Sequence, residues 1–287
     1  MITEQSPNDD LNEAAAWVRS AKHLLILTGA GISAESGIPT FRDDDGFWRE
    51  FPPERFATWD GLMATAIRSP ARFAAFVQAV VEPIANAQPN AAHIAIAAAE
   101  QDVPITIVTQ NIDGLHQEAG STRVHEIHGS LLEIVNRPGR SRSLIERQEL
   151  LFISSSLKEA SRSFFVLPSV MSALRNIIGL GSRGIHYPNL VLFGNLLAEP
   201  AWTNALEATQ NTNCVIQIGT SGLVMPAAAL PYKARAAGAR IIAINPQEAD
   251  GDIWLQGTAA KVVPELLSAA FGCKESVIPS SSQLGHV

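Results

Sequence analysis

The chain has 287 residues, of which 46% are hydrophobic and 17% charged, and this composition excludes wholesale disorder because it offers ample apolar surface to bury. Its 21 Lys and Arg against 28 Asp and Glu give a net charge of −7, which argues against a general attraction to nucleic acid or to an anionic membrane. The two cysteines, Cys214 and Cys273, are far apart in sequence, so this chain alone builds neither a disulfide framework nor a four-thiolate zinc site.

The N-terminal segment carries no recognisable targeting signal. Residues 1–13 are acidic and polar, the opposite of the basic start and apolar core of a signal peptide. No apolar run approaches the ~20 residues that a membrane-spanning helix needs. We therefore expect a cytoplasmic protein without a membrane partner.

Helices and buried strands alternate along the chain. A helix is predicted over residues 12–21, strands over 24–28, 104–109, 190–194, 215–220 and 240–245, and further helices over 69–87, 90–100 and 225–237. Runs that are apolar on both faces are typical of parallel strands covered by helices on each side. The alternation predicts an α/β fold with a doubly wound, Rossmann-like parallel sheet and a ligand at the carboxyl ends of its strands.

A glycine-rich turn follows the first predicted strand. The sequence Gly29-Ala30-Gly31-Ile32-Ser33-Ala34 has G-x-G-x-x-A spacing, in which glycines let backbone N–H groups approach a pyrophosphate at a helix N-terminus. The alternative is a turn whose glycines serve packing only, and the acid that usually binds ribose about 20 residues later is missing. The next segment, residues 35–48, is a polar and aromatic loop of the kind that forms a lid beside a nucleotide.

Two polar segments follow the next strand. Amide and carboxylate groups in Gln110-Asn111-Ile112-Asp113-Gly114 can hold ribose hydroxyls and a carboxamide, although a simple hydrogen-bonded turn is the alternative. His125 and His128 have i, i+3 spacing that permits a metal site, but no third ligand is evident nearby. A single histidine acting as general base is more attractive, with a satisfied or surface histidine as the alternative.

In their order and spacing, these segments resemble the signature blocks of the sirtuins, the NAD-dependent protein deacylases. The blocks are residues 29–43, 109–116, 125–130, 193–194, 219–221, 226–228 and 244–245. The resemblance implies a large Rossmann-like domain and a smaller inserted domain with a zinc module and a helical insert, with NAD between them. We assign residues 1–135 and 188–272 to the large catalytic domain, with 45–90 including the helical part of the small domain, 136–187 to a degenerate zinc module and 273–287 to a flexible tail.

The resemblance also implies the role of each site residue. The residues expected to bind NAD are Gly29, Ala30, Gly31, Ser33, Ala34, Thr40, Phe41, Arg42, Gln110, Asn111, Ile112, Asp113, Gly219, Thr220, Ser221, Asn245 and Ala259. His128 matches the catalytic base, with Asn111 and Asp113 in the catalytic set. Val191, Phe193 and Gly194 would line the channel for an acylated-lysine protein substrate.

In the implied reaction, the acyl oxygen of an acyl-lysine attacks C1′ of the nicotinamide ribose, and nicotinamide leaves. His128 then takes a proton from a ribose hydroxyl, which attacks the imidate carbon. Water completes the release of free lysine and O-acyl-ADP-ribose. Two other classes of function remain open. One is an NAD hydrolase or ADP-ribosyltransferase, in which water or another nucleophile replaces the acyl oxygen, and the other is an inactive NAD-binding protein.

Residues 136–187 depart from the sirtuin pattern. They contain seven Arg, Lys158 and three Glu, a net charge of +5, whereas the rest of the chain carries −12. The window has no cysteine, and His186 is its only candidate nitrogen ligand, so we predict no structural zinc and no metal ligands. The abrupt change in composition fits either a divergent, metal-free module, with residues 150–153 and 164–167 as a replacement core, or a local reading-frame error. We expect a solvated loop here rather than a specific nucleic-acid site, because few aromatic residues are interleaved with the basic ones.

Two further departures concern the substrate. Asn195 stands where sirtuins usually have Glu after Phe193-Gly194, so a role for that charge in the channel is in doubt. The Tyr-x-x-Arg pair with which some sirtuins bind acidic acyl groups is absent from the matching stretch, residues 73–78. The chain is therefore expected to act on a neutral acyl group, acetyl or longer.

Overall fold

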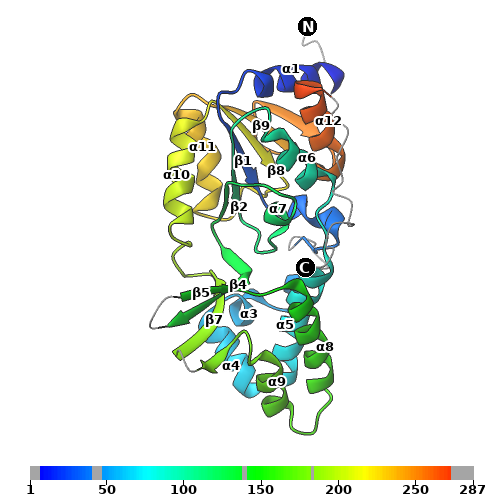
Figure 1. The fold of residues 1–287 in the computed structure, drawn as a ribbon, viewed down its shortest axis with the longest axis vertical. Coiled ribbons are helices and arrows are strands. Elements are labelled where there is room, and N and C mark those ends of the chain that lie inside the picture. The colour runs from blue at the N-terminus through cyan, green and yellow to red at the C-terminus, as the bar shows by residue number, and fades with distance from the viewer. Residues whose placement is uncertain (1–6, 41–46, 138–140, 182–183, 273–287) are drawn as a thin grey trace, which may run out of the picture.

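A computed structural model describes residues 7–40, 47–137, 141–181 and 184–272, and these form two sheets (Figure 1). The large sheet is parallel, in the order β10-β9-β8-β1-β2-β3, and the small sheet is antiparallel, in the order β5-β4-β7-β6. The strands of the large sheet are β1 (Leu24–Thr28), β2 (Ile105–Thr109), β3 (Val124–Glu126), β8 (Cys214–Ile218), β9 (Arg240–Asn245) and β10 (Ile253–Gln256). Those of the small sheet are β4 (Gly129–Arg137), β5 (Ser141–Leu144), β6 (Gly179–Gly181) and β7 (Gly184–Leu190).

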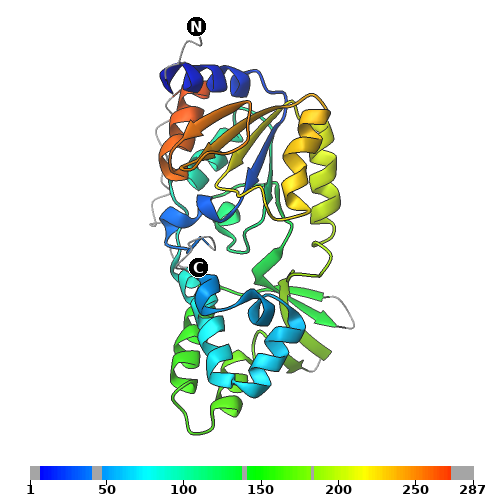
Figure 2. The same cartoon turned by 180° about the vertical axis from the view of Figure 1, so that it is seen from behind.

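Helices cover both faces of the large sheet, so the predicted Rossmann-like arrangement is confirmed. One face packs against α1 (Pro7–Arg19), α6 (Ala91–Ala99) and α12 (Ala259–Phe271), and the other against α10 (Ala201–Asn211) and α11 (Leu230–Ala236). The two helical layers lie on opposite sides of the sheet in the view from behind (Figure 2). Both faces of the sheet are covered because alternate residues of β1 are apolar on each side. Leu24 and Ile26 belong to one core, and Leu25 and Leu27 belong to the other.

The small sheet shares its core with two groups of helices. The first group is α2 (Phe47–Glu50), α3 (Pro53–Phe56), α4 (Trp59–Arg68) and α5 (Pro70–Asn86), and the second is α8 (Arg147–Ala160) and α9 (Val166–Leu174). Leu150, Ile153 and Leu157 are fully buried on α8, at the i, i+3, i+7 spacing of one helical face, and α8 packs against α5.

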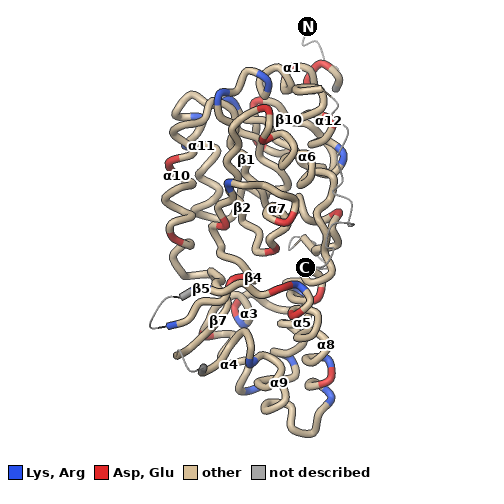
Figure 3. Tube along the Cα trace, viewed as in Figure 1, with Lys and Arg blue, Asp and Glu red and all other residues tan. Residues whose placement is uncertain are grey.

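The window from 136 to 187 is therefore helical over much of its length, and the expectation of a solvated loop was wrong. The high serine and arginine content of the window favoured a loop, although the apolar residues within it follow a helical period. In the expected replacement core, Leu150 and Ile153 are buried, but Leu151 and Phe152 are exposed. Three of the four residues 164–167, namely Phe164, Phe165 and Leu167, are exposed as well. Phe164 and Phe165 are 93% and 68% exposed. Along the trace of this half of the molecule, Lys and Arg are interspersed with Asp and Glu (Figure 3).

The strand expected at 190–194 lies earlier, because β7 ends at Leu190. Its pairing with β4 is shifted between Ser130 and Ile134, an irregularity next to Pro188, which has no N–H to donate. The helix expected over 225–237 begins as a 3-10 turn, Ala227–Ala229, before α11. Among the described residues, no helix combines the length and apolar character needed to cross a bilayer.

Candidate active site

The turns after β1 and β8 touch each other at the carboxyl edge of the large sheet. The N–H of Gly31 donates to the carbonyl of Gly219 at 3.0 Å. A Cβ placed on Gly31 would lie 2.5 Å from the Cα of Gly219, and Gly219 itself has a φ of +59°. Both positions therefore require glycine for packing. This supports the alternative that the glycines of the G-x-G-x-x-A turn are needed for packing. The cofactor role of Gly29, Ala30, Gly31 and Ala34 stays a prediction.

The segment after β2 is tied to the same turn by side-chain hydrogen bonds. Asn111 donates from Nδ2 to the Gly29 carbonyl at 3.2 Å and to Ser33 Oγ at 3.0 Å. Ser33, which is fully buried, donates its hydroxyl to Asp113 Oδ2 at 2.7 Å. The backbone N–H of Leu115 donates to the other Asp113 oxygen at 3.0 Å. The sequence-predicted residues Ser33, Asn111 and Asp113 thus form one connected network.

Burial and hydrogen bonding act in opposite directions on Asp113. The side chain is only 4% exposed, and this burial raises the pKa of its carboxyl. Donation from Leu115 N–H, Ser33 and Asn111, together with the positive charge of Arg147, opposes the rise in pKa. The ionised form of this buried carboxyl group therefore depends on its donors.

His128 follows β3 and is oriented by the segment after β2. Its Nδ1 lies 2.9 Å from the carbonyl oxygen of Gln110. A carbonyl can only accept, so Nδ1 carries the proton and the lone pair of the neutral ring is on Nε2. Burial lowers the pKa of His128, and the bond to Gln110 opposes this shift. A neutral imidazole with a fixed tautomer is suited to act as a general base.

The turns after β8 and β9 bring together further residues that the resemblance predicts to bind NAD. Asn245 is 8% exposed and donates from Nδ2 to the Thr220 carbonyl at 3.3 Å. Ser221 Oγ accepts from the N–H of Leu223, and Ala259 is buried at the start of α12. A residue that sequence reasoning missed also acts here: Glu35 accepts from Thr258 Oγ1 and from the N–H of Ala260, and so caps α12.

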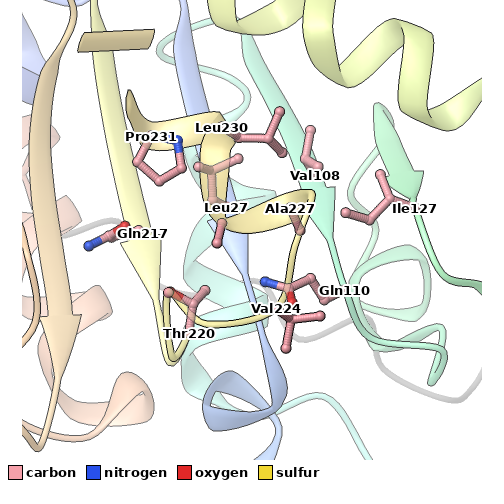
Figure 4. Close-up of a pocket in the computed structure, with 12 residues that line it drawn as sticks. Leu27, Val108, Gln110, Ile127, Gln217, Thr220, Val224, Ala227, Leu230 and Pro231 are labelled. Atoms are coloured by element: carbon pink, nitrogen blue, oxygen red, sulfur yellow. The ribbon is translucent and has the colours of Figure 1, made fainter. Parts of the chain in front are cut away.

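A surface pocket lies beside this edge, on the face covered by α10 and α11 (Figure 4). Two predicted cofactor residues, Gln110 and Thr220, line it together with apolar side chains such as Leu27, Val108 and Ile127. The Ser33–Asn111–Asp113 network does not line this pocket. The predicted residues therefore gather at one edge of the sheet but not in one hollow. Thr40 is half-buried, and Phe41 and Arg42 lie outside the described residues.

Of the predicted substrate residues, Val191 is hydrogen-bonded to His128 and Phe193 contacts the helical part of the small core. The N–H of Val191 donates to the His128 carbonyl at 2.9 Å, and the N–H of Phe193 donates to the Ala57 carbonyl at 2.8 Å. The Phe193 ring is 55% exposed and faces Trp48 at a centroid distance of 6.4 Å. Gly194 has a φ of +84°, which favours glycine there.

A second hollow lies behind β3 and β4 and contains His125, Glu126 and Glu133 among its lining residues. Burial raises the pKa of Glu126 to about 7. In the described part of the chain, no group of three or more His, Cys, Asp or Glu side chains is placed to hold a metal ion. The i, i+3 histidine pair thus has no third partner within those residues.

Comparisons with known proteins agree with this arrangement. A model of the Sir2 family matches residues 29–226. An NAD-dependent protein deacylase 2 from Archaeoglobus fulgidus is 35% identical over 266 residues, covering 90% of this chain and 95% of that protein. An NAD-dependent protein deacylase from Mycobacterium tuberculosis is 34% identical over 249 residues, covering 85% and 96%.

Two solved structures are similar over nearly the whole chain. A Sir2 homologue in complex with NAD has a TM-score of 0.71 and 30% identity, covering 90% of this chain and 93% of that one. Sir2Af2 bound to a myristoylated histone peptide has a TM-score of 0.65 and 28% identity, covering 92% and 97%.

Proposed function

This chain belongs to the Sir2 family, and on that premise we propose that it is an NAD-dependent protein lysine deacylase, which transfers an acyl group to ADP-ribose and releases nicotinamide. The observation that carries the proposal is the pairing of His128 Nδ1 with the Gln110 carbonyl. It fixes the tautomer of a half-buried imidazole beside the Asn111–Asp113 network. A general base and a polar pocket edge are thus held by one short segment of chain.

The polar groups at this edge fit a dinucleotide. The amides of Gln110, Asn111 and Asn245 and the hydroxyl of Thr220 offer donors and acceptors for ribose hydroxyls and a carboxamide. When bound, NAD would supply the ribose carbon to which the acyl oxygen attaches. His128 Nε2 would accept the proton of a ribose hydroxyl, and Asp113 would hold the 110–115 segment through its bonds to Ser33 and Leu115.

The proposed substrate is an acylated lysine of another protein, with a neutral acyl group. Sir2Af2 was solved with a myristoylated histone peptide. On α5, where acid-binding sirtuins have Tyr-x-x-Arg, this chain has Phe73 and Phe76, and the Phe76 ring packs against Phe51 and Phe56. An aromatic cluster offers no counter-ion to an acidic acyl group. We expect acetyl-lysine and longer neutral acyl-lysines to react, and succinyl-lysine to react poorly.

Residues 136–187 are proposed to act as a metal-free replacement for the zinc module. Support comes from α8, where three apolar residues at helical spacing are buried in the core shared with α5. Elemental analysis of the purified protein should find substoichiometric zinc, and dialysis against EDTA should leave the melting temperature unchanged. One zinc per chain, or a fall in melting temperature with EDTA, contradicts the proposal.

The function is tested by nicotinamide release from purified protein and NAD, with and without an acetyl-lysine peptide. We expect release that depends on the peptide, together with loss of the acetyl group from lysine. Equal release without peptide would instead identify an NAD hydrolase or transferase. No release under either condition would contradict a catalytic function.

A further inference from the structure

Arg147, the first residue of α8, uses all three nitrogens of its guanidinium to bind three different parts of the chain. Nε donates to Glu118 Oε2 at 2.6 Å, and Nη2 donates to the backbone carbonyl of Asp113 at 2.6 Å. Nη1 donates to the backbone carbonyl of Ile84. The Arg147 side chain is only 15% exposed. The guanidinium therefore makes a partly buried contact at three points rather than a single surface ion pair.

The three acceptors belong to three separate segments of the chain. Ile84 lies on α5, in the small core, and Glu118 ends α7 (Leu115–Glu118). Asp113 lies between them in the polar segment after β2. The backbone of this segment has a second tie to the small sheet, because the N–H of Leu131 donates to the Ile112 carbonyl at 3.0 Å. Arg147 thus fastens the start of α8 to the segment that carries the proposed chemistry.

The chemistry of arginine suits this task better than that of lysine. The guanidinium is planar and its donors are fixed relative to one another, whereas an ammonium is a point charge on a flexible stem. Its charge also favours the ionised carboxylate of Asp113. If the bond from Arg147 were lost, the backbone at Asp113 would be free to move. Such a movement would be transmitted along the segment to Gln110, whose carbonyl orients His128.

We propose that Arg147 is a positioning residue of the reaction, which holds residues 110–113 in the geometry that His128 requires. The inference rests on the proposed deacylase function. It connects the most divergent part of the chain, residues 136–187, to the most sirtuin-like part. The segment that lacks the zinc-ligand cysteines is, on this view, required for catalytic geometry through one side chain.

Arg142 provides a matched control on the same segment. It pairs with Glu133 at 3.0 Å, but its side chain is 51% exposed. Exposed pairs of this kind contribute little to stability. Arg142→Met removes the same charge from the same window without touching residues 110–115.

The test compares Arg147→Met, Arg147→Lys and Arg142→Met in the full chain, each first shown to be folded by its urea unfolding curve. In Arg147→Met we expect kcat to fall by roughly 10- to 100-fold, because small displacements of reacting groups have effects of that order. The KM for the peptide should change less than kcat. Arg147→Lys should recover little of the lost kcat, and Arg142→Met should match the wild type. Equal kcat per folded molecule in all variants overturns the proposal.

A second measurement does not depend on enzymatic activity. Hydrogen exchange of the backbone amides of residues 110–115 should be faster in Arg147→Met than in the wild type, and unchanged in Arg142→Met. Unchanged exchange in all variants overturns the positioning role even if the protein is a deacylase. If the wild type shows no peptide-dependent nicotinamide release, the proposed function fails, while faster exchange would still support the Arg147 contact as the element that holds the segment. If Arg147→Met does not fold, Arg147→Lys and Glu118→Gln, which weaken the contact in part, take its place in both measurements.

Discussion

Ser33 and Asp113 lie 80 residues apart in sequence and share a buried hydrogen bond of 2.7 Å. The hydroxyl of Ser33 is the donor, and it belongs to the turn after β1, whereas Asp113 belongs to the segment after β2. Together with the two bonds that Asn111 donates to Gly29 and Ser33, this bond links the glycine turn to the polar segment. Its loss should therefore be visible both in stability and in the response of stability to pH.

In Ser33→Ala, the buried Asp113 carboxylate loses one of its donors. We expect the free energy of unfolding to fall by roughly 1–3 kcal/mol at pH 7, the usual penalty for a buried polar group left without a partner. The pKa of Asp113, already raised by burial, should rise further. Since a protonated carboxyl needs this donor less, the deficit should shrink at pH 4. Urea unfolding at both pH values gives the measurement, and Ser20→Ala, which removes an exposed hydroxyl, is the control. A deficit that is the same at both pH values would sink the assignment.

In His128→Ala, deacylation should fall by roughly 10²- to 10⁴-fold, the typical contribution of a positioned general base. His125→Ala is the matched control, since His125 lies three residues away and is not oriented by Gln110. Because burial lowers the pKa of His128, the neutral base persists below pH 6.5, and the acid limb of the wild-type rate profile should have its midpoint below that value. A His128→Ala enzyme with wild-type rate, or a midpoint above pH 6.5, contradicts the role.

The sequence predicted best those features that depend on neighbours along the chain. The strands β1, β2 and β8 are runs of five buried residues followed by polar turns, and such a pattern needs no partner to be recognised. The strands β3 and β10 were missed because they have three and four residues and mix polar with apolar side chains.

Contacts between residues far apart in the chain could not be predicted from the sequence, for a different reason. The acceptors of Arg147 include backbone carbonyls 34 and 63 residues away, and a backbone carbonyl has no signature in the residue type. The packing requirement at Gly31 likewise arises from the turn after β8. The helix α8 is different, because the spacing of Leu150, Ile153 and Leu157 is a local pattern that indicates a helix even within a window rich in serine and arginine.

Because His93 and His116 are buried, we predict that the protein loses stability in acid. Their rings contact each other at a centroid distance of 4.9 Å, and burial lowers the pKa of His93 to about 4 and that of His116 to about 3. In the unfolded chain both would titrate near 6.5, so the unfolded state binds more protons as pH falls. The free energy of unfolding should therefore decrease between pH 6.5 and pH 4, by up to about 1.4 kcal/mol per pH unit for each histidine.

The His93→Gln variant isolates this effect. Gln keeps a side chain that can accept from the N–H of Asn90 in the capping box of α6. Glu126, with its pKa raised to about 7, changes stability in the opposite direction over pH 4.5 to 7, so only the difference between variant and wild type is informative. That difference should favour the variant progressively as pH falls from 6.5 to 4. Parallel curves would contradict the prediction.

The core role of α8 predicts a contrast between two apolar residues of the 136–187 window. Ile153 is fully buried, whereas Phe164 is 93% exposed. Ile153→Ala should lower the free energy of unfolding by roughly 2–5 kcal/mol through the lost contacts and the cavity, and Phe164→Ala should change it by less than about 0.5 kcal/mol. Urea unfolding curves of the two variants and the wild type give these free energies. Equal, small effects would mean that the window contributes no core, as expected of a segment translated in the wrong frame.

From the Gly31–Gly219 contact, we predict that Gly31→Ala lowers the free energy of unfolding even when no NAD is present. The added Cβ would lie 2.5 Å from the Cα of Gly219, so the turns after β1 and β8 have to separate. Gly37→Ala is the control, because its φ of +86° costs only about 1–2 kcal/mol and no atom lies within 4 Å of the new Cβ. We expect Gly31→Ala to lose clearly more unfolding free energy than Gly37→Ala in the absence of NAD. A Gly31→Ala protein that is as stable as the wild type but binds NAD weakly would show instead that the glycine serves the cofactor alone.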